Sequence, residues 1–336
     1  MPAGAVTPDN TATVWTDFTK LSPIVWLDEV RLQMEIIQPA LDLYDYDKLD
    51  QFNKDYSGVA SGGFGNVMDE GEDYTVTTHN QEDNMSVSVR QRGAAYQITE
   101  RLLLGNKYSD VESGMRDTGR RLVKTRGRDA MQHAFTFGFS SSFTDAEGNT
   151  VTNGIANQST EAIFANTHTM ATGETYDNLG ATDALGETTL KTLTDLTPDF
   201  IDEDGFPVTW GTGAKTLLVS DDVPIVFTAR RLTTQEFEID SAERNINLFP
   251  DLYKMMSNAF LDTLASGKKD SAKDKYYFIL DRQILNEKAK FSDFLQPTLS
   301  GPFEDNQNGG MLWRSKTLYD IGVHVAHIGA GAPATS

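Results

Sequence analysis

Four cations at every fourth position are the residues whose spacing most clearly suggests chemistry: Arg116, Arg120, Lys124 and Arg128. Side chains four residues apart share one face of a helix, where like charges destabilise it by about 0.2–0.5 kcal/mol per pair. Nearby Glu112 and Asp117 offset only part of this charge. This cationic row predicts either a solvated face with intrachain ion pairs or a surface that needs an external anion. The second alternative is an intersubunit contact or an inward surface that faces DNA.

An acidic group of side chains lies upstream of the cationic row. Its members are Asp69, Glu70, Glu72, Asp73, Glu82 and Asp83, with only Arg90 and Arg92 opposing them nearby. Alone, such a group is typical of a solubilising loop. Opposite charges are complementary across an interface, so an acidic loop and a basic helix in one chain also indicate contact between copies. We therefore predict that this acidic group meets the cationic row of a neighbouring copy.

Motifs that would carry catalysis or bind a metal or cofactor are incomplete. Residues 211–216 (GTGAKT) resemble the end of a phosphate-binding loop, but the spacing is wrong and a strand follows instead of a helix. His324 and His327 are three apart on an expected strand, so they point to opposite faces and cannot chelate one metal together. The acidic stretch 199–205 does not match the spacing of a calcium loop. We predict a non-enzyme with no catalytic residue, no metal site and no cofactor.

Composition excludes several classes of protein. The 336 residues include 49 acids against 29 bases, a net charge of −20, which argues against general nucleic-acid binding and against docking on an anionic membrane. The chain has no cysteine, which excludes disulfides and thiol nucleophiles. The N-terminus lacks the features of a signal peptide, and no apolar run approaches the roughly 20 residues that span a bilayer. We expect a soluble protein made in the cytoplasm.

Two helices are predicted in the first half of the chain. Residues 1–20 are small and polar and suggest an extended arm. Residues 24–37 have helical spacing, and Pro39 should end this helix. The longest helical pattern covers 109–137 and carries the cationic row. Three glycines weaken this helix and allow a bend or break in it, namely Gly114, Gly119 and Gly127.

A β-hairpin is predicted between these helices. Two alternating runs, 74–78 and 85–89, flank a polar turn at 79–84. A glycine cluster at 58–65 suggests a hinge before it. An isolated two-stranded hairpin is at best marginally stable in water, so this one should lie on another surface, such as a second subunit.

The second half mixes strands and helices. A helix is expected at 183–200, and another begins after Asp222 with Pro224 in its first turn. The tail 329–336 is small and should be flexible. Buried strands are expected at 215–220, 275–280 and 318–328.

The order of these parts resembles the major capsid proteins of tailed double-stranded-DNA bacteriophages. The local sequences that carry the resemblance are YQITE (96–100) before the long helix, ANTH (165–168) followed by GETYDN (173–178), and KTLLVSDD (215–222). The resemblance implies an α+β capsid fold. Its parts would be an N-terminal arm at 1–57, an extended β-hairpin loop at 58–95, a peripheral domain with a spine helix at 96–180, an axial domain at 181–301, and a return to the peripheral domain with a C-terminal tail at 302–336.

This resemblance also implies a function and partners. Copies of the chain would self-assemble in the host bacterial cytoplasm into hexamers and pentamers of an icosahedral virion shell around double-stranded DNA. The shell would use a separate scaffolding protein, a portal protein and, in some systems, decoration proteins. Two alternatives stay open: a cellular nanocompartment shell with the same fold, and a monomeric carboxylate-based hydrolase.

Overall fold

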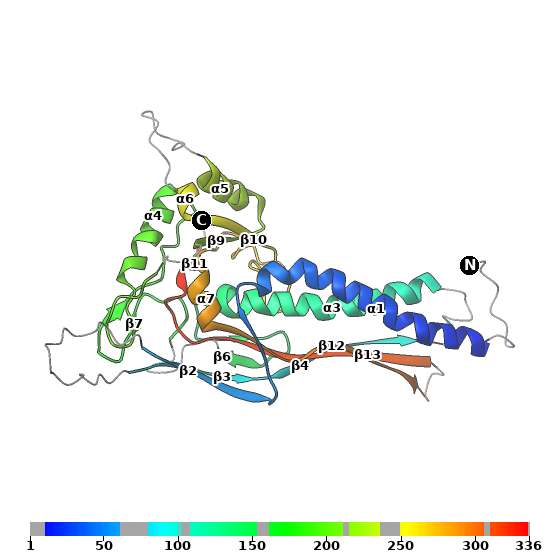
Figure 1. The fold of residues 1–336 in the computed structure, drawn as a ribbon. Helices are drawn as coiled ribbons and strands as arrows, with labels where there is room; N and C mark the ends of the chain where they lie inside the picture. Colours follow the sequence, from blue (N-terminus) through cyan, green and yellow to red (C-terminus); the bar gives the residue numbers. More distant parts are fainter. Residues whose placement is uncertain are drawn as a thin grey trace, which may run out of the picture.

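A computed structural model describes residues 11–60, 80–99, 101, 108–152, 161–210, 215–235, 249–305 and 310–334. Two four-stranded sheets organise the molecule (Figure 1). Two long helices, α1 and α3, extend along the first sheet to form an elongated part of the molecule. Shorter helices surround the second sheet in a more compact part.

Helices α1 (Thr11–Leu41) and α3 (Tyr108–Met131) pack side by side and run in the same direction (Figure 1). Their shared core is formed by Trp26, Val30, Ile37, Val111, Met115, Leu122 and Val123. The predicted long helix is confirmed, and a short π-helix, η2 (Gln132–Thr136), follows it directly. The alternative of a break at the glycines is wrong, because α3 is continuous from Tyr108 to Met131. The glycines are instead sites of close approach. A Cβ at Gly119 would lie 3.2 Å from Val30, and one at Gly127 would lie 2.8 Å from Ile37.

Helix α1 is longer at both ends than the sequence predicted. It begins at Thr11, so the expected extended arm is wrong for residues 11–20. It also continues through Pro23 and Pro39 to Leu41. Each proline removes one backbone donor from the helix, and the turn around Pro39 is still closed by the bond from Asp42 N to the Gln38 carbonyl at 2.8 Å.

The first sheet has the strand order β1-β12-β13-β4. Strands β12 and β13 form a long antiparallel ribbon, β4 adds antiparallel to β13, and β1 adds parallel to β12. Trp313 of β13 is fully buried in the core that α1 and α3 share. The bounds are β1 Asp45–Lys48, β12 Ala289–Asp305, β13 Gly310–Val323 and β4 Arg90–Ile98.

The hairpin prediction is partly confirmed and partly wrong. The run 85–89 lies in a strand, β3 (Gln81–Ser88), followed by β4. Its described partner is β2 (Asn53–Val59), in an antiparallel pair. The expected turn at 79–84 is wrong, because Gln81 already begins the strand. The other predicted run, 74–78, lies outside the described residues.

The second sheet has the order β10-β9-β11-β14. Strand β9 coincides with the predicted strand 215–220, and β11 with most of the one predicted at 275–280. Helices α4, α5, α6 and α7 belong to this part of the chain. The bounds are β10 Lys254–Asn258, β9 Lys215–Ser220, β11 Tyr277–Asp281, β14 Gly329–Ala332, α4 Glu187–Asp195, α5 Val223–Thr234, α6 Phe249–Leu252 and α7 Arg282–Lys288.

The expectation of a flexible C-terminal tail is wrong for residues 329–332. They form β14, whose four residues are all buried and pair with β11. Small side chains are required here because the strand lies against its neighbours at short range. A Cβ at Gly329 would lie 2.1 Å from the Ile279 carbonyl oxygen, and one at Gly331 would lie 2.6 Å from the Phe278 ring.

The remaining boundaries differ from the predictions by a few residues. Helix α4 is shorter than the expected helix 183–200 and is followed by a 3₁₀ turn at 197–199. Two short antiparallel strand pairs lie between α3 and α4 in the chain. Their bounds are β5 Ser142–Thr144 with β6 Thr150–Thr152, and β7 His168–Thr169 with β8 Thr175–Tyr176.

Candidate assembly surface

The cationic row lies on α3, and α1 supplies it with a buried carboxylate. Arg120 Nε donates to Glu29 Oε1 at 3.0 Å, and Arg116 lies 3.7 Å from the other Glu29 oxygen. Gln33 also donates to Glu29 at 2.9 Å. Glu29 is only 2% exposed, so its charge is held beside the row by packing of α1 on α3. Glu29 of the same chain therefore supplies part of the negative charge that the row requires.

The other members of the row differ in their surroundings. Arg128 pairs with the adjacent Asp129 at 2.7 Å, and Arg116 also pairs with Glu112 one turn away at 2.9 Å. Lys124 is exposed and makes no ion pair with any described residue. Lys124 is therefore the member of the row whose charge no described carboxylate of the chain neutralises.

Arg126, beside the row in sequence, points into the core. Its guanidinium forms a two-point pair with Asp293 of β12, at 2.7 and 3.3 Å, and donates to the Thr317 hydroxyl at 2.7 Å. The rings of Phe291 and Tyr319 lie 4.9 and 5.0 Å from it. Both charged side chains are 1% exposed. This pair fixes α3 on the β12–β13 ribbon, and no local sequence pattern marks Asp293 as the partner of Arg126.

The described members of the acidic group, Glu82 and Asp83, lie in β3. Glu82 of β3 is buried, and its carboxylate pairs with Lys288 of α7 at 2.5 Å. A neighbouring contact joins Asn80 N to the Asp204 carboxylate at 3.0 Å. Glu82 therefore holds β3 to α7 of the same chain. Asp83 lies in β3, and Asp69, Glu70, Glu72 and Asp73 lie outside the described residues.

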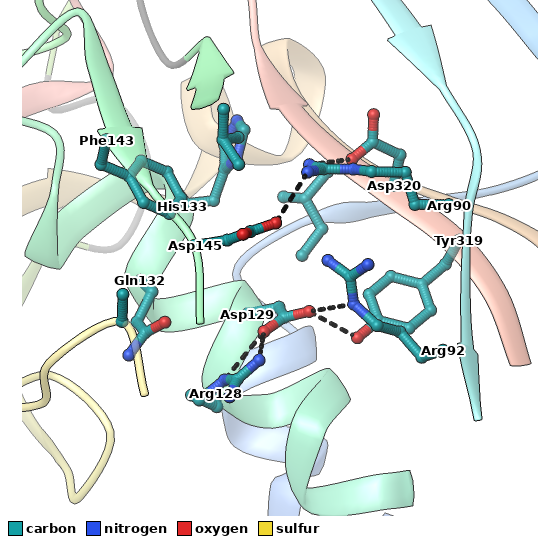
Figure 2. Close-up of a pocket in the computed structure, with 13 residues that line it drawn as sticks. Arg90, Arg92, Arg128, Asp129, Gln132, His133, Phe143, Asp145, Tyr319 and Asp320 are labelled. Atoms are coloured by element: carbon teal, nitrogen blue, oxygen red, sulfur yellow. Dashed lines mark hydrogen bonds and ion pairs between the residues drawn. The ribbon is translucent and has the colours of Figure 1, made fainter. Parts of the chain in front are cut away.

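An arginine–aspartate cluster connects the end of α3 to β4, β13 and the β5–β6 turn around a cavity of about 30 Å³ (Figure 2). Arg90 of β4 lies 3.2 Å from Asp320 and 3.9 Å from Asp145. The partners of the Asp129 carboxylate are Arg92 Nε at 3.3 Å, Arg128 at 2.7 Å and the Tyr319 hydroxyl at 2.8 Å. Each of the three arginines is paired with a carboxylate, so the cluster is suited to hold four elements together.

The two predicted strand histidines lie beyond the end of β13 and are both buried. Burial, aided by the nearby Lys288 charge, lowers the pKa of His324 to about 4 and that of His327 to about 3. The described part of the chain contains no group of three or more His, Asp or Glu side chains placed to hold a metal ion. Among the same residues, no helix is long and apolar enough to cross a membrane.

The chain is similar in structure, but not in sequence, to known proteins. No family model matches it, and no curated protein matches its sequence. The capsid of an empty GTA particle matches with a TM-score of 0.52 and 11% identity, over 88% of this chain and 90% of that one. A structure from Gordonia phage Cozz matches with a TM-score of 0.51 and 8% identity, over 88% and 87% of the two chains. A virus-like particle from Pyrococcus furiosus has a TM-score of 0.47 and 8% identity, over 93% and 98%.

Identities this low compare architecture alone, and the match extends over nearly the whole chain rather than one motif. In this chain, that length includes a long helix packed on an extended ribbon and a second sheet with its own helices. The α+β chain therefore has the tailed-phage major capsid fold that the order of its parts predicted.

Proposed function

We propose that the chain is a major capsid protein whose copies assemble into hexamers and pentamers of an icosahedral shell around phage double-stranded DNA. The observation that carries the proposal is the capsid fold matched over 88% of the chain. The shell would be a component of the virion and would form in the host bacterial cytoplasm. A separate scaffolding protein and a portal protein would assist assembly, with decoration proteins as further partners.

The surface of α1 supports an assembling subunit. One face of the helix packs on α3, while large aliphatic side chains on other faces are exposed: Leu21, Ile24, Leu27, Leu32 and Ile36. Burying apolar surface contributes roughly 25 cal/mol per Å². Several large apolar side chains exposed on one helix are typical of interaction sites. Contact with neighbouring copies would remove this surface from water.

Size-exclusion chromatography with light scattering, followed by negative-stain imaging, tests the shell. We expect megadalton particles or capsomer rings, with a scaffolding partner or crowding agent added if needed. A strict monomer under all these conditions would refute assembly and leave the hydrolase alternative. If particles purified from cells enclose an enzyme cargo instead of DNA, the nanocompartment alternative is correct.

We further propose that Asp69, Glu70, Glu72 and Asp73 of one copy bind the cationic row of the next. Lys124 is the informative position, because reversing Arg116 or Arg120 would also break their pairs with Glu29. Lys124→Glu should reduce assembly and leave the monomer folded, while Lys124→Arg, the matched control, should assemble normally. Normal particles from Lys124→Glu would exclude Lys124 from the contact.

The net charge of −20 supports a shell that encloses DNA without binding it tightly. Packaged DNA could then slide along the inner surface. Strong, salt-sensitive binding of duplex DNA by free subunits would contradict this part of the proposal.

A further inference from the structure

The buried carboxylate of Glu82 lies where β3 meets α7. It pairs with Lys288, the last residue of α7, at 2.5 Å. Gly58 of the neighbouring strand β2 leaves room for this carboxylate, because a Cβ at Gly58 would overlap it. These contacts hold one negative charge of β3 at a defined position in the interior of the molecule.

A turn at 202–206 brings further carboxylates to the same place. Asn80, the residue before β3, donates its backbone N–H to the Asp204 carboxylate at 3.0 Å and its side-chain amide to the Glu203 carbonyl at 3.4 Å. Glu203 is only 5% exposed, and its own carboxylate accepts from Ala171 N at 2.7 Å. The turn that holds the start of β3 therefore also places the Glu203 charge near that of Glu82. We call this group the Glu82 junction; its members are Glu82, Lys288, Asp202, Glu203 and Asp204.

Like charges oppose one another within the Glu82 junction. Burial raises the pKa of the Glu203 carboxyl, and the negative charges of Glu82, Asp202 and Asp204 raise it further. Such repulsion is stronger in the interior than in water, because the surroundings screen it less. Glu203 therefore takes up its proton at a higher pH than an ordinary glutamate.

The basic groups around the junction do not titrate with Glu203. Lys288 already pairs with Glu82, and its neighbour Lys290 pairs with Asp45 at 2.5 Å. The pKa of His324 is about 4 and that of His327 is about 3, so both rings stay neutral above pH 5. The remaining titratable groups near the junction are His168, whose pKa is lowered by burial, and Glu174, which is exposed beside the 202–206 turn.

We propose that the Glu82 junction is a proton-operated latch, which holds β3 on α7 and on the 202–206 turn more firmly when Glu203 is protonated. Asp202 and Asp204 belong to the same turn as Glu203, so they stay beside it whether β3 is bound or released. Glu82 belongs to β3, so only the bound state contains the repulsion between Glu82 and Glu203. The bound state therefore takes up a proton more readily, and lowering the pH favours it. This latch acts within one copy and does not require assembly into a shell.

Hydrogen exchange of the full-length, unassembled chain tests the latch, because backbone amides exchange when the segment that contains them opens. We expect the protection of β3 (residues 81–88), corrected for the intrinsic pH dependence of exchange, to rise as the pH falls from 7.5 to 5.0. Strand β9 (residues 215–220) is the internal control, and its protection should not rise, because it is not part of the junction. Protection of β3 that stays constant or falls over this range would overturn the latch and leave the shell function untouched.

Three amide variants identify the groups responsible. Glu203→Gln keeps an oxygen that can accept from Ala171 N but carries no charge, so the rise in β3 protection should disappear. Glu82→Gln removes the other charge of the repelling pair and should lose the rise as well. Glu174→Gln changes an exposed carboxylate beside the same turn, so it is the matched control and should keep the rise. A Glu203→Gln chain that responds to pH like the wild type would show that Glu203 does not operate the latch.

Discussion

At the residue scale, position on the helix decides the role of each α3 cation. Arg126 comes two residues after Lys124, which rotates it by roughly 200° around a helix of 3.6 residues per turn. Lys124 is therefore exposed while Arg126 is buried against Asp293. Sequence periodicity predicts that Lys124 and Arg126 lie on different faces of the helix, but it does not identify which face is buried.

Removing one partner of the buried pair should destabilise the fold strongly. In Asp293→Ala, the Arg126 guanidinium keeps its charge in the core without a counter-ion, which typically costs about 3–5 kcal/mol. Urea unfolding of the monomer should show this loss. The double variant Arg126→Met, Asp293→Leu should regain most of it, because no charge then remains buried. A loss below about 1 kcal/mol for Asp293→Ala would contradict the role assigned to the pair.

The buried histidines should make stability depend on pH. Their folded-state pKa values, about 4 for His324 and about 3 for His327, lie below the ordinary value of about 6.5. Between about pH 6.5 and 4, the unfolded chain therefore binds protons that the folded chain does not, and stability falls as the pH falls. The urea midpoint should drop between pH 7.5 and 4.5. His324→Asn with His327→Asn should drop less, and an equal drop would exclude these histidines as the cause.

At the scale of elements, the sequence predicts the helices and strands that depend on local patterns, but not the features that depend on long-range contacts. The long helix and strand β9 were predicted because their periodicity is local. The sequence does not indicate why α3 has glycines at these positions, because the side chains that approach them lie elsewhere in the chain, at Trp26, Val30, Ile37 and Tyr96. Strand β14 was missed for a similar cause: residues such as Gly and Ala carry little strand propensity, and only their position beside β11 makes small side chains necessary.

Strand β14 should be essential for the second sheet. A chain ending at residue 328 loses the pairing with β11 and the bonds between Gly331 and residues 178 and 180. At about 1 kcal/mol per buried hydrogen bond, more than about 3 kcal/mol of unfolding free energy should be lost. A chain ending at residue 334 is the matched control and should melt like the full chain. Equal melting temperatures for both truncations would show that β14 does not contribute.

At the scale of the whole molecule, charge opposes association. Each copy carries a net charge of −20, so copies repel one another at long range. The screening length falls from about 30 Å at 0.01 M salt to about 10 Å at 0.1 M. Assembly of the proposed shell would therefore depend on short-range burial and a few paired charges, which are screened less.

The threshold concentration for assembly should therefore fall as salt rises from 0.01 to 0.15 M. Light scattering across a protein dilution series at each salt concentration measures it. A threshold that is unchanged or higher at 0.15 M salt would show that long-range repulsion does not control assembly.

The sequence by itself determined the helices and strands that have a clear periodicity, and their order along the chain. It also shows that the catalytic and metal-binding motifs are incomplete. These features depend on residue type and on spacing within a few turns. Tertiary structure decided which charges meet. Arg120 reaches Glu29 across 91 residues, Arg126 reaches Asp293 across 167, and Lys288 reaches Glu82 across 206. No local pattern marks such partners, because packing of distant segments brings them together and excludes the water that would otherwise solvate each charge.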